Sequence, residues 1–126
     1  MYYKESVMQI LEQQKLQIVL NDFVDACKTV FSNKLSDVRL FGSYARGDYH
    51  EGSDIDVMVV LDMNDSEVTK YRRDICRIAA ALEIEYNVTI SPVLYGKDEY
   101  NSRKTFGFCK NVEQEGVSQC VGQSYA

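Results

Sequence analysis

The sequence predicts a small α/β domain, and three observations carry this expectation. Apolar residues recur every three or four positions over residues 4–31, as they do in an amphipathic helix. Two β-rich segments follow at 38–41 and 55–61, and the second is a nearly continuous β-branched run, typical of a buried strand. A second helical pattern over 67–82 and a third strand over 88–95 complete the order helix, strand, strand, helix, strand.

The ends of these elements carry local signals. The first helical pattern stops at Asn33, and residues 62–65 have the composition of a turn. Either Asp65 or Ser66 can cap the second helix, because a short polar side chain accepts a hydrogen bond from the first free N–H groups. Pro92 interrupts the third strand and has no N–H to donate, which predicts a sheet edge or a bulge there.

The C-terminal part is less regular. After Asp98 the pattern predicts only a single helical turn at 111–115, which Gly116 would stop. The last ten residues, 117–126, are polar, and we expect them to be disordered.

Length and charge narrow the function classes. A chain of 126 residues predicts one domain over 1–126, with a motif core at 38–95, and 45% hydrophobic content supports a packed core. The net charge of −5 argues against strong nucleic-acid binding, because attraction to phosphates supplies most non-specific affinity. No run of eighteen apolar residues exists, so we expect no membrane span.

Cysteine usage and the N-terminus suggest a cytoplasmic protein. No signal-peptide pattern opens the chain. The chain has one histidine and no Cys-x-x-Cys pair, so a zinc site is not expected. We interpret the scattered cysteines as reduced thiols: Cys27, Cys76, Cys109 and Cys120.

The main chemical signal is a pair of acids that follows a Gly-Ser turn. Gly42 and Ser43 come directly after the first strand, and ten residues later Asp54 and Asp56 open the second. Side chains two apart on a strand share a face, with Cα atoms about 7 Å apart. Two such carboxylates can bind Mg²⁺, and without a cation their repulsion costs stability. We therefore predict that Asp54 and Asp56 are the metal-binding, catalytic pair.

The turn itself is suited to phosphate. Gly42 permits tight backbone geometry, and Ser43 offers a hydroxyl and an N–H where a short helix can begin. Arg46 lies in that helix and could grip a triphosphate with its guanidinium fork, and Gly47 would end the helix. Arg46 could equally form an ion pair with a neighbouring acid: Asp48, Glu51 or Asp54.

This arrangement resembles a known family. Gly-Ser-x10-Asp-x-Asp, with Ala-Arg-Gly inside it, is similar to the signature of the DNA polymerase beta-type nucleotidyltransferase superfamily. The size and acidity resemble its minimal nucleotidyltransferases (MNT), often the antitoxins of HEPN/MNT toxin–antitoxin pairs. The resemblance implies a polymerase beta-like fold, in which helices flank a small mixed sheet. It also implies phosphate binding by Gly42 and Ser43, and Mg²⁺ binding by Asp54 and Asp56.

The same resemblance implies a reaction. A nucleoside monophosphate, AMP from ATP, would move to a hydroxyl acceptor with release of pyrophosphate. In the MNT antitoxins that acceptor is a hydroxyl, commonly of a tyrosine, on the HEPN toxin. Two alternatives remain open: a binding module that neutralises its partner by contact alone, and transfer to a small molecule of the aminoglycoside type. The oligomeric state is not predicted.

One expected residue is missing. The superfamily usually places a third carboxylate on the next strand, facing the first two, but residues 88–94 contain no acid. Ser91 stands at the expected position. Glu85 precedes the strand and Asp98 follows it, and a substitute role for either needs a shift of several residues. Nucleotide and Mg²⁺ binding are therefore better supported than turnover.

Aromatic side chains and a histidine flank the motif. Tyr44 and Tyr49 could stack on a base or accept an adenylyl group, although packing in the turn is the commoner role. His50 lies in a polar loop and is expected to be exposed to solvent.

Overall fold

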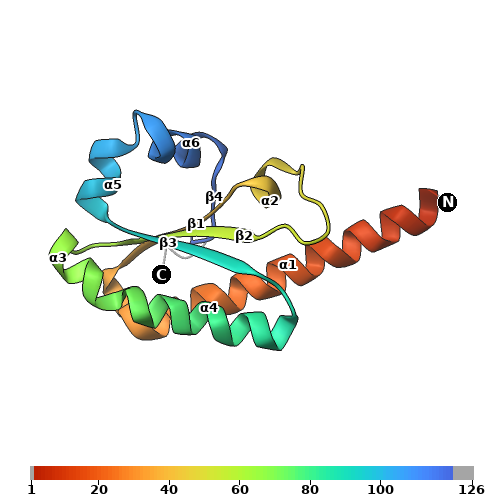
Figure 1. The fold of residues 1–126 in the computed structure, drawn as a ribbon, viewed down its shortest axis with the longest axis horizontal. Helices are drawn as coiled ribbons and strands as arrows, with labels where there is room; N and C mark the ends of the chain where they lie inside the picture. The colour runs from red at the N-terminus through yellow and green to blue at the C-terminus, as the bar shows by residue number, and fades with distance from the viewer. Residues whose placement is uncertain (1, 121–126) are drawn as a thin grey trace.

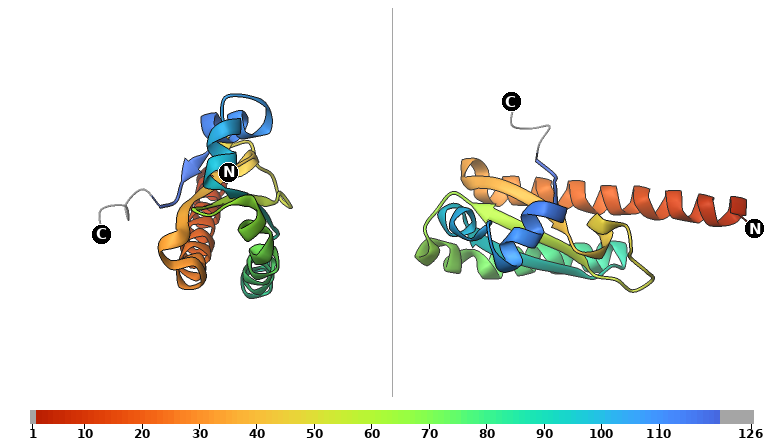
Figure 2. Two further views of the ribbon diagram at one scale, coloured as in Figure 1. Left: turned by 90° about the vertical axis from the view of Figure 1, so that its left-hand side faces the viewer. Right: turned by 90° about the horizontal axis from the view of Figure 1, so that it is seen from above.

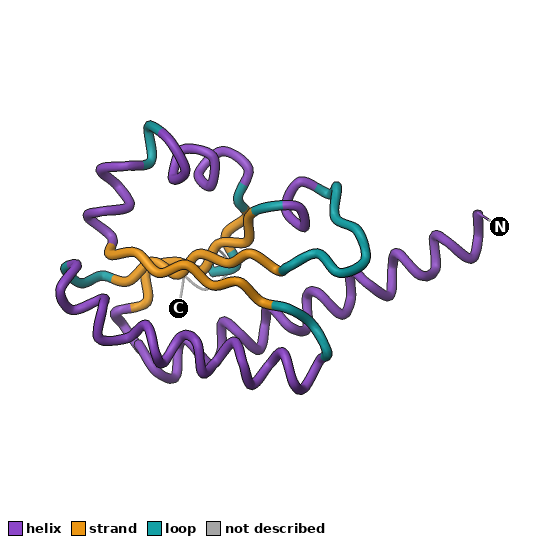
Figure 3. Tube along the Cα trace, viewed as in Figure 1, coloured by secondary structure: helices purple, strands orange, loops and turns teal. Residues whose placement is uncertain are grey.

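The structure is a computed structural model that describes residues 2–120. Its helices are α1 (Tyr2–Phe31), α2 (Ser43–Arg46), α3 (Asp65–Val68), α4 (Arg72–Tyr86), α5 (Lys97–Arg103) and α6 (Gly107–Glu115). Its strands are β1 (Leu35–Phe41), β2 (Ile55–Leu61), β3 (Ile90–Gly96) and β4 (Val117–Ser118) (Figure 3). Short 3₁₀ turns occupy Ser32–Lys34 and Thr69–Tyr71.

The four strands form one mixed sheet in the order β3-β2-β1-β4. β2 and β3 run parallel, whereas β1 is antiparallel to both of its neighbours, β2 and β4. This agrees with the predicted small mixed sheet flanked by helices. β3 lies at an edge of the sheet in the described residues, so the missing N–H of Pro92 breaks no inner ladder.

Helices cover both faces of the sheet (Figure 1). α1 and α4 lie on one face, and α2, α5 and α6 lie on the other; the end-on view in Figure 2 separates the two layers. A hydrophobic core lies on each face of the sheet. Successive side chains of β2 point to opposite faces and therefore pack in the two cores alternately. Ile55, Val57 and Val59 pack on the α1/α4 side, whereas Met58 and Val60 pack on the α5/α6 side. Asp56 lies two residues before Met58, so its side chain points to the α5/α6 side as well.

The segment before α4 differs from the predicted continuous helix over 67–82. α3 is a single turn, a 3₁₀ turn follows, and α4 then runs to Tyr86. The cap is Asn64, not Asp65 or Ser66, because the Asn64 Oδ1 accepts from the Glu67 N–H at 3.0 Å. Asn64 Oδ1 also accepts from the Ser66 hydroxyl, so Ser66 supports the cap that Asn64 provides and does not cap the helix itself.

The C-terminal part is more ordered than predicted. The expected turn at 111–115 is the end of the nine-residue helix α6, and α5 precedes it where no element was predicted. The expected disorder of 117–126 is wrong for Val117 and Ser118, which form β4 against β1. Residues 121–126 lie outside the described residues.

Gly116 ends α6 for a reason other than the predicted backbone freedom. Its φ of −72° is open to any residue. A Cβ there would lie 2.3 Å from the Val112 carbonyl oxygen and 2.8 Å from Arg39 Nε. Gly116 is therefore needed for a close approach between α6 and β1.

The N-terminal turns of α1 extend beyond the sheet (Figures 1 and 2). Side chains at 7–15 are exposed, and burial begins further along the helix, with Val19, Leu20 and Phe23. No helix within residues 2–120 has the length and apolar character to cross a membrane.

Candidate functional site

The two halves of the predicted motif, the Gly42-Ser43 turn and the Asp54/Asp56 pair, lie together at one end of the sheet, where β1 ends and β2 begins. Gly42 lies between β1 and α2, with φ 76° and ψ −156°, a conformation that L side chains rarely adopt. A Cβ at Gly42 would lie 2.2 Å from Asp56 Oδ2. The glycine thus allows both the turn and the close approach of the Asp56 carboxylate, and it brings the two halves of the motif together.

The two acids differ in exposure. Asp54 directly precedes β2 and is exposed, whereas Asp56 lies in the strand and is partly buried. Burial raises the pKa of Asp56 above its ordinary value, and the nearby charges of Asp54 and Glu115 raise that pKa further. Arg46 acts in the opposite direction and lowers it. The carboxylates repel one another, so a cation at this place would lower the energy of the charged form.

The donor set fits Mg²⁺. Magnesium prefers oxygen ligands and is commonly held by one or two carboxylates together with substrate phosphates. Asp54 and Asp56 offer such a pair beside the turn of Gly42. No cluster of three or more His, Cys, Asp or Glu side chains in the described residues forms a fuller protein cage.

Arg46 forms two ion pairs on the surface of α2. Its Nε lies 3.2 Å from Asp48 Oδ2, and its Nη1 lies 3.2 Å from Glu115 Oε1. Asp48 was one of the three partners considered from sequence; Glu51 and Asp54 are not its partners in the structure. Gly47 ends the helix as predicted, with φ 87°.

Glu115 is the residue that sequence reasoning missed. Its carboxylate accepts from the Gly42 N–H at 3.1 Å and pairs with Arg46, although 69 residues separate it from Arg46. It closes α6, where a negative charge is unfavourable next to the helix dipole. An acidic residue in the last turn of a helix is unfavourable unless it binds a cation or a donor from another part of the chain, and this is the signal in the sequence that could have indicated the contact.

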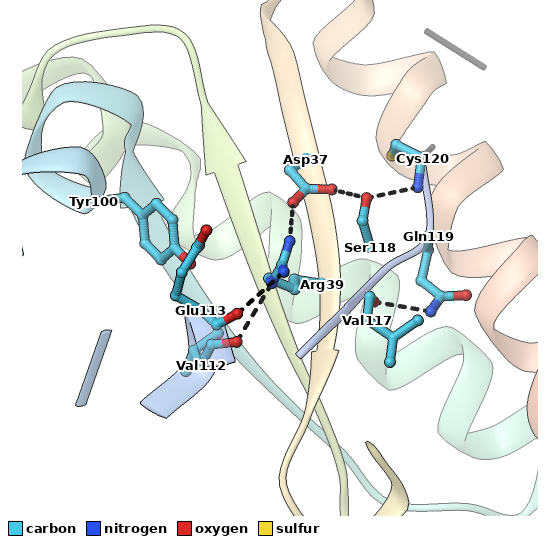
Figure 4. Close-up of polar contacts among 9 residues, drawn as sticks. All are labelled: Asp37, Arg39, Tyr100, Val112, Glu113, Val117, Ser118, Gln119 and Cys120. Atoms are coloured by element: carbon cyan, nitrogen blue, oxygen red, sulfur yellow. Dashed lines mark hydrogen bonds and ion pairs between the residues drawn. The ribbon is translucent and has the colours of Figure 1, made fainter. Parts of the chain in front are cut away.

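A second network places the end of α6 on the sheet (Figure 4). Arg39 of β1 donates to the carbonyl oxygens of Val112 and Glu113, each at 3.4 Å. Its Nη1 lies 3.3 Å from Asp37 Oδ2, and the Ser118 hydroxyl of β4 donates to Asp37 Oδ1 at 2.5 Å. The Val112 carbonyl oxygen already accepts from the Gly116 N–H at 2.8 Å, so Arg39 is its second donor, and Arg39 also gives the Glu113 carbonyl a donor from the sheet.

The other side of α6 is held by α5. The Tyr100 hydroxyl donates to Glu113 Oε2 at 2.5 Å. Tyr100 also packs with Cys109 and Val112 in the core on this face of the sheet. Burial and the Glu113 hydrogen bond raise the pKa of Tyr100, so the hydroxyl stays a donor at neutral pH.

The third-acid position contains no acid. The β2/β3 register pairs Asp56 with Ser91, the residue that the sequence places there. Glu85 lies near the end of α4, which covers the opposite face of the sheet. Asp98 lies in the first turn of α5, after the far end of β3. Neither substitute is brought to Asp56.

A cavity of about 350 Å³ lies beside the motif, between α1, the loop at 47–54 and residues 87–89, which precede β3. Tyr44 and Tyr49 line it and stack with ring centroids 4.4 Å apart, so they pack in the turn. Ile55 also lines it, which places the cavity on the face of the sheet opposite to Asp56. His50, also on its wall, is exposed as predicted.

Comparison with known proteins supports one family. The nucleotidyltransferase domain family matches residues 20–116. Two proteins of Methanocaldococcus jannaschii, each described as a "Putative protein adenylyltransferase", are similar to the chain. One is 36% identical over 79% of this chain and 93% of its own length. The second is 35% identical over 77% of this chain and 90% of its own length.

Solved structures share the fold. One, described as "Structure of putative minimal nucleotidyltransferase", has a TM-score of 0.56 and 23% identity over 82% of this chain and 92% of that chain. Another, described as a toxin–antitoxin with AMP-PNP, has a TM-score of 0.52 and 23% identity over 79% of this chain and 70% of that chain. With the motif assembled on such a fold, and with the match spanning most of the chain, this protein belongs to the nucleotidyltransferase domain family.

Proposed function

We propose that this protein is a Mg²⁺-dependent adenylyltransferase that moves AMP from ATP to a hydroxyl group on a partner protein. The observation that carries this proposal is the meeting of the Gly42 turn with the Asp56 carboxylate in a nucleotidyltransferase domain. The descriptions of the two archaeal relatives as protein adenylyltransferases support the choice of a protein acceptor. The structural neighbour with AMP-PNP supports the choice of ATP as donor.

Each motif residue has a role in the proposed reaction. Asp54 and Asp56 hold Mg²⁺, which when bound supplies positive charge to the phosphates and to the reacting oxygens. Gly42 shapes the phosphate-binding turn while its own N–H donates to Glu115, and Ser43 binds phosphate oxygens through its backbone N–H and its hydroxyl. Arg46 adds a planar cation whose geometry matches a phosphate.

The chemistry is a single displacement at the α-phosphorus. The acceptor oxygen forms a bond to that phosphorus, the bond to the bridging oxygen breaks, and pyrophosphate leaves. The hydroxyl proton must also depart. Ser91, beside Asp56, has no carboxylate to receive that proton, so it passes to solvent, and we expect transfer to be slow.

A HEPN-type toxin is the proposed acceptor protein. The motif resemblance to MNT antitoxins supports it, and so does the fold likeness to a chain described as part of a toxin–antitoxin. We place the pair in the cytoplasm, where thiols stay reduced, in keeping with the free cysteines of the described residues.

The first test is titration calorimetry of ATP into the protein, with and without Mg²⁺, beside the double variant Asp54→Asn/Asp56→Asn. We expect binding that depends on Mg²⁺ and is lost in the variant. The second test incubates the protein with α-labelled ATP and a HEPN protein encoded beside it. Label on the partner supports the proposal, and an absence of both Mg²⁺-dependent binding and label counts against it.

Ser91 at the third-acid position favours one alternative, a module that neutralises its partner by contact alone. This alternative predicts that the double variant still binds and silences the partner in a co-expression growth assay. A double variant that binds the partner but no longer silences it would rule out the alternative.

A further inference from the structure

Glu115 reaches the motif from the C-terminal part of the chain and contacts both of its phosphate-directed groups. One oxygen, Oε1, accepts from the Gly42 N–H at 3.1 Å and lies 3.2 Å from Arg46 Nη1. The second oxygen, Oε2, lies 3.4 Å from the same Arg46 nitrogen. The side chain of Glu115 is only 27% exposed, compared with 63% for Asp48, the other ion-pair partner of Arg46.

The surrounding chain fixes Glu115 at this place. Arg39 binds the two carbonyls at the end of α6, and Asp37 holds Arg39 from the other side. Gly116 is required because a Cβ would collide with Arg39 and with the last turn of α6. The last turn of α6 is thus tied to β1 only a few residues before Gly42, so a carboxylate at Glu115 meets the turn without a long reach.

We propose that Glu115 is a positioning residue of the nucleotide site, which holds the Gly42 turn and the Arg46 guanidinium in the geometry that receives a triphosphate. This inference rests on the proposed function. Glu115 acts through Gly42 and Arg46, and it belongs to α6, an element outside the motif core.

The physical reason is the freedom of an unsupported arginine. An exposed Arg side chain has many rotamers, and binding a phosphate with it costs the entropy of fixing one of them. The Glu115 carboxylate fixes Nη1 of the guanidinium and Asp48 accepts from Nε, which leaves Nη2 for a ligand. Its hydrogen bond to Gly42 also holds the turn at the distance that Asp56 requires.

The test is Mg-ATP binding by calorimetry to the wild-type protein, Glu115→Ala and Glu115→Gln. Glu115→Ala should raise the Kd about tenfold, as expected for the loss of a hydrogen bond that involves charged groups. Glu115→Gln keeps an acceptor for the Gly42 N–H and should stay within about threefold of the wild type. Binding that is retained in Glu115→Gln but weakened in Glu115→Ala would indicate positioning of the site. Thermal unfolding of each variant measures whether the substitution has instead destabilised α6.

Asp48→Asn is the matched control, because it removes the other ion pair of Arg46 and leaves the Gly42 contact intact. We expect its Kd to match the wild type. If Glu115→Ala does not fold, Glu115→Asp replaces it: the carboxylate stays, but the shorter side chain cannot reach both partners. It should then weaken binding as the alanine does.

Three results would overturn the inference. An unchanged Kd in Glu115→Ala or Glu115→Asp would show that the contact does not position the site. A lower Kd would show that Glu115 competes with the phosphates for Gly42 and Arg46. An absence of Mg-ATP binding to the wild type would remove the proposed function, and this inference with it, and is thereby distinct from the first two results.

Discussion

The carboxyl group of Asp56 lies in surroundings that disfavour its charge. Burial and the nearby Asp54 and Glu115 carboxylates raise its pKa above the ordinary 3.8, and only Arg46 opposes them. The folded protein therefore binds a proton at Asp56 more tightly than the unfolded chain does. Stability falls as the pH rises from the unfolded pKa through the folded pKa, and the penalty is complete above the folded pKa.

Replacement of Asp56 by Asn should stabilise the protein without a metal. At pH 7 we expect Tm to rise by a few degrees, since about 1 kcal/mol shifts Tm by roughly 3–6 °C in a domain of this size. Below the unfolded pKa of 3.8 the wild type is protonated too, so the difference should vanish. Thermal scans at several pH values, in chelator and then in Mg²⁺, measure it. Added Mg²⁺ should stabilise the wild type alone; a variant less stable than the wild type at pH 7 in chelator would contradict the expectation.

Gly42 tests how closely the two halves of the motif approach. Gly42→Ala adds a Cβ 2.2 Å from Asp56 Oδ2 and strains a positive φ, so it should destabilise by about 2–4 kcal/mol. Gly47→Ala is the control for a Cβ at positive φ without a clash: Gly47 lies in the left-handed helical region, at φ 87° and ψ 6°, and no atom lies within 4 Å. Chemical denaturation of both variants should therefore show the larger loss for Gly42→Ala, which combines the contact with a backbone conformation that only glycine adopts easily. Equal losses would mean that Asp56 moves aside freely.

At the scale of elements, α6 depends on donors from the sheet. Arg39→Ala leaves the carbonyls of Val112 and Glu113 without these partners, and should cost about 1–3 kcal/mol, with faster amide hydrogen exchange in α6 than in α4. Arg103→Ala is the comparison, since Arg103 is exposed and an ion pair at the surface, such as its pair with Glu99, contributes about 0–1 kcal/mol. Unchanged exchange in α6 would show that its other contacts, the packing against α5 and the hydrogen bonds of Glu113 and Glu115, hold the helix without Arg39.

Local patterns were enough to predict most of the elements that carry the motif. The run at 55–61 gives β2 with its bounds unchanged, because β-branched residues without polar interruption allow one interpretation. α2 and its end at Gly47 follow from the turn. Part of the site was predictable in the same way, because Gly42 and Asp56 are close in sequence and belong to one motif. The contact of Glu115 with Gly42 was not predictable, because these residues are 73 positions apart.

The rest depends on distant contacts. α6 and β4 read as a loose tail because their stabilising partners, Arg39 and Asp37, lie on β1, more than 70 residues away. The cap at Asn64 was missed because three polar residues in succession compete for one role, and only the backbone geometry decides. Sequence periodicity contains neither kind of information.

At the scale of the whole molecule, the sheet separates two packed layers. The core on the α1/α4 side is the larger, with Phe23, Val57 and Leu61 almost fully buried, and the smaller core on the other side supports the site. Asp56, the acid for which we propose a metal-binding role, lies on the side of the smaller layer. The larger core can thus supply most of the stability of the fold, while a charged group near the site, such as Asp56, is retained although it is destabilising.

The N-terminal turns of α1 should contribute little to this stability. Side chains at 7–15 are exposed, and the family match begins at residue 20. Removal of residues 1–11 should therefore shift Tm by less than about 2 °C and leave the urea m-value unchanged, because m follows the surface exposed on unfolding. Removal of residues 1–23 is the contrasting deletion: it takes Val19, Leu20 and Phe23 from the core and should prevent stable folding. A fall of more than about 5 °C for the shorter deletion, which corresponds to about 1 kcal/mol or more, would contradict this expectation and show that these turns stabilise the fold.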